Sequence, residues 1–171
     1  MDVNSVSALV VAALASATDV RSRRIPNVLT FGAALVAVAF AAATGGARGL
    51  VMALAGWVVG LLLYMPLFAL GGMGAGDIKL LAALGAWLGP WMAVWVALYA
   101  AVAGGVMAVV LALRRQYLRT AWNNVWLLLA HWRVSGIRPM PELTLERGRG
   151  PRLAYAVPIA VGTAVALWAR S

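Results

Sequence analysis

The stretch GGMGAGDIKLLAALGAWLG, residues 71–89, joins a glycine-rich turn, a single carboxylate and a continuous apolar run. The carboxylate is Asp77, one of only five acidic residues in the chain. A charged side chain at the start of an apolar run costs free energy, so its presence there suggests a function. Asp77 is therefore the first candidate functional residue.

Composition predicts an integral membrane protein. The 171 residues are 64% hydrophobic and only 11% charged, and their mean hydropathy is +0.90. Too few polar side chains remain to cover a water-soluble globule. The chain has no cysteine and a single histidine, His131, which excludes thiolate chemistry and a histidine metal site. We expect a lipid bilayer as partner, and neither a metal nor another cofactor.

Hydrophobic runs predict an all-α fold of about six transmembrane helices. A helix needs about 20 mainly apolar residues to cross the hydrocarbon core. The fourth run has 14 residues, and at about 1.5 Å per residue it reaches only about 21 Å, so we expect it to start inside the membrane or to tilt little. The runs cover about 3–18, 28–43, 50–70, 75–88, 91–113 and 153–169.

The basic residues predict the orientation of the chain. The first run lacks a preceding basic segment, and its arginines follow it, which is the pattern of an anchor whose N-terminus lies outside. With that orientation only Arg48 and Arg170 lie outside. Twelve basic residues then face the cytoplasm, so the net charge of +9 reports topology and not a nucleic-acid partner. They are Arg21, Arg23, Arg24, Lys79, Arg114, Arg115, Arg119, Arg133, Arg138, Arg147, Arg149 and Arg152.

Two features refine this topology within one domain, residues 1–171. The arginine-rich loop at about 114–152 contains Trp122, Val125, Trp126 and Leu129 at helical spacing, which predicts an interfacial helix on the inner leaflet. A second tryptophan cluster predicts the outer interface, although packing inside the protein explains it about as well. That cluster is Trp87, Trp91 and Trp95.

Two carboxylates differ from the rest. Asp19 closes the first run and Asp77 opens the fourth, so the predicted topology brings both to one depth on the cytoplasmic side. Taken singly, Asp77 is also explained by a helix N-terminus with Lys79 as partner, and Asp19 by pairing with Arg23. Solvation or surface ion pairs explain the other acidic residues, Asp2, Glu142 and Glu146.

A carboxylate pair without thiols, triads or metal ligands suggests aspartic protease chemistry. Two neighbouring carboxyls do not both ionise readily, so they share one proton and titrate as a unit. One carboxyl holds and polarises a water molecule while the other protonates the scissile carbonyl. Gly71, Gly72, Gly74 and Gly76 would let backbone approach the carboxylate closely.

Two motifs resemble those of a known family. TDVRSRRIPN, residues 18–27, and GAGDIKL, residues 74–80, look like the two signatures of the type IV prepilin peptidases, membrane aspartic proteases of the GxGD kind. The segment RLAYAVPIAVG, residues 152–162, is similar to the proline-containing end of that family. The likeness extends over about 10–162.

The resemblance implies a bacterial inner-membrane endopeptidase that cuts the short basic leader of prepilins at the cytoplasmic face, for pilus or secretion-system assembly. It implies Asp19 and Asp77 as the catalytic pair. Gly74 and Gly76 would shape the site, and Lys79 occupies a motif position without an assigned chemistry. Pro26 and Asn27 would start the second helix, because proline presets φ for a first turn.

Departures from the family narrow the expected type. The large members carry an early cytoplasmic insertion, often with cysteine pairs, and also methylate the new N-terminus. This chain has neither an insertion nor a cysteine, so it resembles the short peptidases of Flp or Tad pili, without methyltransferase activity.

Two other functions stay open from the sequence. One is another GxGD protease of the preflagellin, presenilin or signal-peptide-peptidase type. The other is a small transporter that uses Asp19 and Asp77 as a proton relay. Glycine pairs predict close helix contacts, but their spacing does not choose between contacts within and between subunits. These pairs are Gly104 with Gly105, and Gly56 with Gly60.

Overall fold

A computed structural model describes all residues except 1, 117, 137, 139, 141–152 and 171. The described residues form helices and no strand. Glu142, Glu146, Arg147, Arg149 and Arg152 of the predicted cytoplasmic loop lie outside the described residues. The helices are α1 (Val3–Ser22), α2 (Asn27–Ala69), α3 (Ala75–Leu88), α4 (Pro90–Arg114), α5 (Leu118–Ser135) and α6 (Ala156–Arg170).

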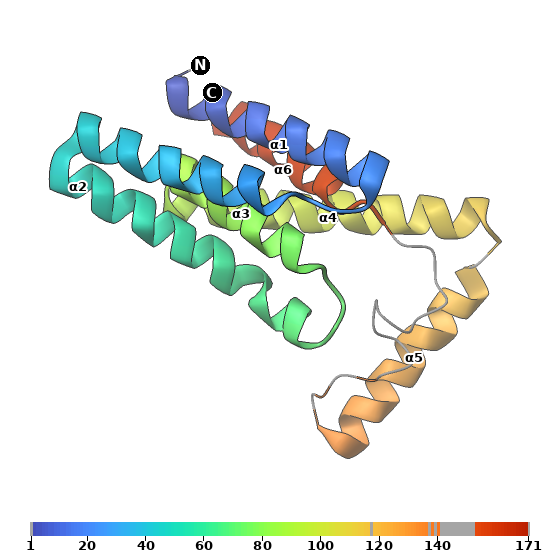
Figure 1. Ribbon diagram of the computed structural model, residues 1–171. Coiled ribbons are helices and arrows are strands. Elements are labelled where there is room, and N and C mark those ends of the chain that lie inside the picture. Colours follow the sequence, from blue (N-terminus) through green and yellow to red (C-terminus); the bar gives the residue numbers. More distant parts are fainter. Residues whose placement is uncertain (1, 117, 137, 139, 141–152, 171) are drawn as a thin grey trace.

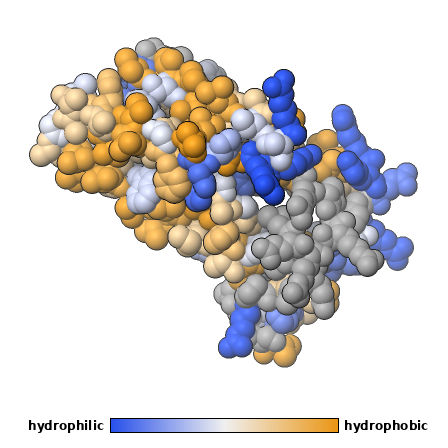
Figure 2. Space-filling view, viewed as in Figure 1, coloured by the Kyte–Doolittle hydropathy of each residue, from blue (hydrophilic) through white to orange (hydrophobic). Residues whose placement is uncertain are grey.

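The chain is an all-helical membrane protein by its composition and by the length of its helices. α1, α2 and α4 are each long and apolar enough to cross a membrane, and α6 is a shorter apolar helix of 15 residues. Figure 2 shows a hydrophobic surface over the helical bundle and hydrophilic groups gathered at one end of it. The prediction of an all-α fold is confirmed for the described residues, and their apolar helices are consistent with a membrane protein.

The second and third apolar runs are joined in one element. The sequence predicts a turn at 44–49 between two helices, and this turn is confirmed: α2 consists of two helices that meet at a kink at Gly46, with φ 56° and ψ −144°. Glycine lacks the Cβ that makes this conformation costly. Figure 1 shows that the chain reverses there, so α2 has two arms that lie side by side. We call residues 27–45 the first arm and 47–69 the second.

α3 is short because it lies inside the bundle. The second arm of α2, α1 and α4 pack around it, and ten of its 14 residues are buried. Leu80, Leu81 and Leu84 have no exposed surface. A helix surrounded by longer helices need not span the hydrocarbon by itself, which accounts for its length without a large tilt.

The predicted glycine contacts are internal to the chain. Gly56 on α2 and Gly85 on α3 face each other so closely that a Cβ on either would overlap the backbone of the other. A Cβ at Gly60 would lie 2.6 Å from the carbonyl oxygen of Leu81. A Cβ at Gly104 would meet Tyr155, whereas Gly105 faces open space. Gly56, Gly60 and Gly104 therefore serve helix packing within one molecule.

The tryptophan cluster divides between core and surface. Trp87 is only 9% exposed and contacts Phe40 of α2, with ring centroids 5.9 Å apart. Trp91 is 71% exposed and stands edge-on to Trp95. The packing explanation is therefore correct for Trp87, and the interfacial one stays a prediction for Trp91.

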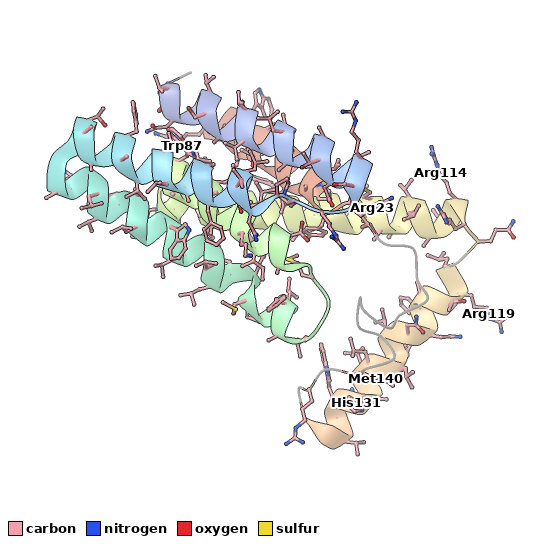
Figure 3. All side chains as sticks on the ribbon, in the orientation of Figure 1. Arg23, Trp87, Arg114, Arg119, His131 and Met140 are labelled. Atoms are coloured by element: carbon pink, nitrogen blue, oxygen red, sulfur yellow. The ribbon has the colours of Figure 1, made fainter. Side chains whose placement is uncertain are left out.

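The two ends of the bundle differ in charge. Figure 3 places Arg23 and Arg114 at one end and Trp87 toward the other, where Figure 1 shows both chain termini. α5 leaves the first of these ends and projects away from the bundle (Figure 1). The candidate active site described below lies at the end of the bundle that carries Arg23 and Arg114.

Candidate active site

Asp19 lies in the last turn of α1 and is 7% exposed. Its Oδ2 accepts a hydrogen bond from the amide N–H of Ala156, at 3.3 Å. α1 ends just beyond it, where Arg23 adopts a left-handed conformation with φ 54° and its N–H donates to the carbonyl of Asp19. The amide of α6 thus holds the carboxylate, and the bond from Arg23 holds the main chain of Asp19.

Ser16 connects the same two helices one turn earlier. Its hydroxyl reaches the carbonyl oxygen of Ala156 at 2.9 Å and that of Ala12 at 2.8 Å. Ala156 is the first residue of α6. The start of α6 is therefore held against the end of α1 on both its amide and its carbonyl side.

Asp77 lies in the first turn of α3 and is 9% exposed. Gly74 caps this helix, and the N–H of Asp77 donates to the carbonyl oxygen of Gly74 at 3.2 Å. The carboxyl of Asp77 is near enough to that of Asp19 for the two to interact electrostatically. The structure thus brings the two sequence-predicted carboxylates together in a buried region at one end of the bundle.

Gly74 and Gly76 leave room around the carboxylates. A Cβ at Gly74 would lie 3.1 Å from Oδ2 of Asp77, and one at Gly76 would lie 3.2 Å from the Cβ of Ile25. The first distance shows close approach of backbone to the carboxylate. The second shows that the two motif segments are packed directly on each other.

Lys79 contacts the start of α2. Its ammonium donates to Oδ1 of Asn27 at 2.9 Å and lies 5.2 Å from the ring centroid of Phe31. No ion pair between Lys79 and Asp77 occurs in the described part of the chain. Pro26 is the N-cap of α2 and Asn27 its first residue, as the sequence predicts. Lys79 therefore links the two motifs.

Two tyrosines near Asp77 are absent from the sequence prediction. Tyr64 of α2 is 3% exposed, and its hydroxyl donates to the carbonyl of Ala97 at 3.2 Å. Its ring stands edge-on to Tyr155, at 6.1 Å between centroids, and both tyrosines lie near Asp77. A buried tyrosine hydroxyl needs a polar partner. A tyrosine within an apolar segment, as Tyr64 is, could therefore have indicated a hydrogen-bonded side chain inside the bundle.

No group of three His, Cys, Asp or Glu side chains that could hold a metal ion occurs among the described residues. Among the described polar groups, the amide of Ala156 donates to Asp19, and the Ser16 hydroxyl reaches the carbonyl of the same Ala156. This arrangement can bind a water molecule and exchange protons with it.

The fold and the site define a helical membrane protein with a buried carboxylate pair. The sequence profile of the type IV leader peptidase family matches residues 6–109, more than half of the chain, and both motifs fall within that range. The chain belongs to the type IV leader peptidase family, and membership implies leader peptidase activity on a prepilin substrate. The match ends within α4, short of the predicted 162. Comparison with curated proteins and with solved structures gave no match.

Proposed function

We propose that this protein is an aspartic endopeptidase that removes the basic leader of type IV prepilins, with Asp19 and Asp77 as the catalytic pair. One observation carries the proposal. The family match contains both aspartate motifs, and the two carboxyls are buried and interact electrostatically. Burial and mutual repulsion favour a pair that shares one proton at neutral pH.

The reaction needs only the pair and one water molecule. The ionised carboxylate accepts a proton from the water as its oxygen attacks the scissile carbonyl carbon. The protonated carboxyl gives its proton to the carbonyl oxygen, which forms a neutral tetrahedral intermediate. Breaking the C–N bond then requires a proton on the leaving nitrogen, which the first carboxyl returns, while the second carboxylate takes a proton from one hydroxyl of the intermediate as the carbonyl re-forms. The proton belongs to the pair throughout, so pH–rate profiles report the pair and not either residue.

The proposal includes the topology and the cellular location of the protein. Residues 1–171 form one membrane domain with the N-terminus outside, about six spans and α5 on the inner leaflet. The basic end of the bundle faces the cytoplasm of a bacterium, because basic residues favour that side. The absent insertion and the absent cysteines favour the short Flp or Tad type, without methyltransferase activity.

The test is a cleavage assay in membranes with a prepilin from the same host. Wild type is compared with Asp19→Asn and Asp77→Asn at equal abundance. We expect each substitution to lower cleavage by about a thousandfold or more, since residues that act as a unit each remove most of the rate. Asp2→Asn is the matched control, because Asp2 is exposed and caps the opposite end of α1.

Either of two results would refute the proposal. Normal cleavage by Asp19→Asn or Asp77→Asn would exclude the pair as the catalytic group. Failure of the wild type to shorten the prepilin would remove the peptidase function, and the proton-relay alternative would then account for a carboxylate pair in a membrane.

A further inference from the structure

Two close contacts fix the register of the second arm of α2 on α3. Gly56 faces Gly85, where a Cβ on either residue would overlap the backbone of the other. A Cβ at Gly60 would lie 2.6 Å from the carbonyl oxygen of Leu81. Four residues forward along α2 thus correspond to four residues back along α3, so the two helices run antiparallel and in step.

The next helical turn brings Tyr64 level with Asp77. Tyr64 follows Gly60 by four residues, and Asp77 precedes Leu81 by four. Tyr64 is 3% exposed, and its hydroxyl donates a hydrogen bond to the carbonyl oxygen of Ala97 on α4, at 3.2 Å. Because packing and this hydrogen bond hold the side chain at both ends, Tyr64 provides a fixed wall at the level of the Asp77 carboxyl.

Tyr155 is connected to the other carboxylate through a peptide group. Its carbonyl and the amide N–H of Ala156 belong to one planar peptide unit. The N–H donates to Oδ2 of Asp19 at 3.3 Å, and the carbonyl oxygen accepts from the N–H of Ile159 at 3.2 Å. The peptide unit that holds Asp19 thus begins directly after the α-carbon of Tyr155. The position of the Tyr155 side chain and the direction of that N–H are therefore coupled.

The two tyrosines contact each other and α4. Their rings stand edge-on, with an interplanar angle of 73°. A Cβ at Gly104 would lie 2.7 Å from Cε2 of Tyr155 and 2.9 Å from its hydroxyl oxygen, so this ring rests on the backbone of α4. The Tyr64 hydroxyl bonds to α4 at Ala97, about two helical turns earlier. An aromatic side chain has few rotatable angles, so the two rings form a stiff connection between α6 and the level of Asp77.

We propose that Tyr64 and Tyr155, which we call the tyrosine pair, are positioning residues that set the separation of Asp19 and Asp77. The inference rests on the proposed peptidase function and extends it to residues outside both motifs. Two neighbouring carboxylates repel each other, so a pair that shares a proton needs a support that keeps its geometry. A misplacement of about 1 Å can lower a rate by about a hundredfold. The tyrosine pair acts through the carboxylates and not on the substrate.

The first test measures kcat and KM for prepilin cleavage. Tyr64→Leu and Tyr155→Leu each remove the ring contact. Tyr99→Leu is the matched control, because the Tyr99 ring stacks on Trp95 and lines a separate cavity with Arg170. We expect kcat to fall by about tenfold to a hundredfold in the first two variants, with KM within about twofold of wild type. The control should keep the kcat of the wild type.

Two further variants separate positioning from general packing. Tyr155→Phe keeps the ring and should restore kcat to within about threefold of wild type. The double variant of Tyr64→Leu and Tyr155→Leu should be no slower than the slower single variant, since both changes remove one contact. A smaller folded fraction with wild-type kcat for each folded molecule would overturn the inference. So would an equal loss of kcat in Tyr99→Leu.

The second test does not depend on cleavage. The chain has no cysteine, so Asp19→Cys and Asp77→Cys together introduce its only two thiols. A short bifunctional thiol reagent should link them within one molecule, which the mass of the intact protein reports. We expect Tyr155→Leu to slow this link by about fivefold or more, because an intramolecular reaction depends on the placement of both groups. Tyr99→Leu should leave the rate unchanged.

The rate of linking separates this inference from the proposed function. A slower link in Tyr155→Leu supports the tyrosine pair even if the wild type proves unable to cut a prepilin, in which case only the peptidase function fails. Equal rates in the unchanged, Tyr155→Leu and Tyr99→Leu backgrounds overturn the inference even if the wild type cuts normally. No link in any background would show that the two side chains lie apart, and it would overturn the inference as well.

Discussion

The amide N–H of Ala156 donates a hydrogen bond to Oδ2 of Asp19, at 3.3 Å. This bond joins the start of α6 to the end of α1, helices at opposite ends of the sequence. Ser16 reinforces the junction through the carbonyl of Ala156. Asp19 is therefore positioned by the C-terminal part of the chain, although its motif lies in the N-terminal part.

Removal of the Ser16 hydroxyl should impair turnover more than binding. Ser16→Ala deletes the bond to Ala156 without touching either carboxylate, and a typical hydrogen bond contributes about 0.5–1.5 kcal/mol. We expect kcat for prepilin cleavage to fall by roughly threefold to tenfold with KM unchanged, since the loss acts on the position of Asp19. The measurement is steady-state cleavage in detergent or membranes, together with its pH profile.

Thr44→Ala provides the control for Ser16→Ala. The Thr44 hydroxyl also donates to a carbonyl of its own helix, that of Phe40 at 2.8 Å, but it is exposed near Gly46. Its loss should leave kcat unchanged. A rise in KM with constant kcat for Ser16→Ala would contradict a positioning role, and restoration of kcat by Ser16→Thr would support it.

Adjacent glycines on α4 should differ in their tolerance of a methyl group. A Cβ at Gly104 would lie 2.7 Å from Cε2 of Tyr155, whereas one at Gly105 would meet nothing within 4 Å. Overpacking typically costs about 1–3 kcal/mol. Gly104→Ala should therefore lower the thermal midpoint in detergent by several degrees, roughly 2–4 °C for each kcal/mol. Gly105→Ala should leave the thermal midpoint unchanged or raise it, because alanine favours a helix more than glycine does.

The same pair of variants also tests the tyrosines. Tyr155 is in contact with Tyr64, and both lie near Asp77. Displacement of Tyr155 by Gly104→Ala should reduce kcat at a temperature where the variant is still folded. Unchanged kcat and unchanged thermal midpoint together would contradict the close approach of α4 to Tyr155.

Lys79 should act through Asn27 and not on the substrate. Its ammonium donates to Oδ1 of Asn27, so Lys79→Met and Asn27→Ala remove the same interaction. We expect similar, small losses of activity and a double variant no worse than either single one, with a coupling of about 0.5–1 kcal/mol. The measurement is a double-mutant cycle on kcat/KM. A loss of a hundredfold or more in Lys79→Met alone would instead indicate direct participation in the chemistry.

Much of the fold follows from the sequence because helix length and apolarity are local properties. The start of α2 at Pro26 and Asn27 was predictable from proline chemistry, and α1, α3, α4 and α6 lie close to their predicted runs. The turn between the two arms of α2 was predictable as well, because Gly46 adopts a backbone conformation that other residues resist.

The surroundings of the carboxylates were less predictable. The order of the motifs predicted that Asp19 and Asp77 share one end of the bundle, which depends only on topology. The contacts of Ser16, Tyr64 and Trp87 depend on which face of each helix turns inward, and helices that are apolar on all sides carry little periodic signal of it. The packing of α6 on α1 is a long-range property of this kind.

The amphipathic helix α5 should lie on the membrane surface. Figure 1 shows that it projects from the bundle, and Trp122 and Trp126 are 64% and 56% exposed in the absence of lipid, with their rings 6.5 Å apart. Such aromatic side chains bury in the headgroup region, whereas Asn124 is two residues from both tryptophans and so lies on the opposite side of the helix. In intact membranes, a cysteine at position 126 should therefore react with a hydrophilic maleimide about tenfold more slowly than one at position 124. Detergent should abolish the difference, because it removes the bilayer surface. Equal rates for Trp126→Cys and Asn124→Cys in membranes would place α5 in water and contradict an interfacial helix.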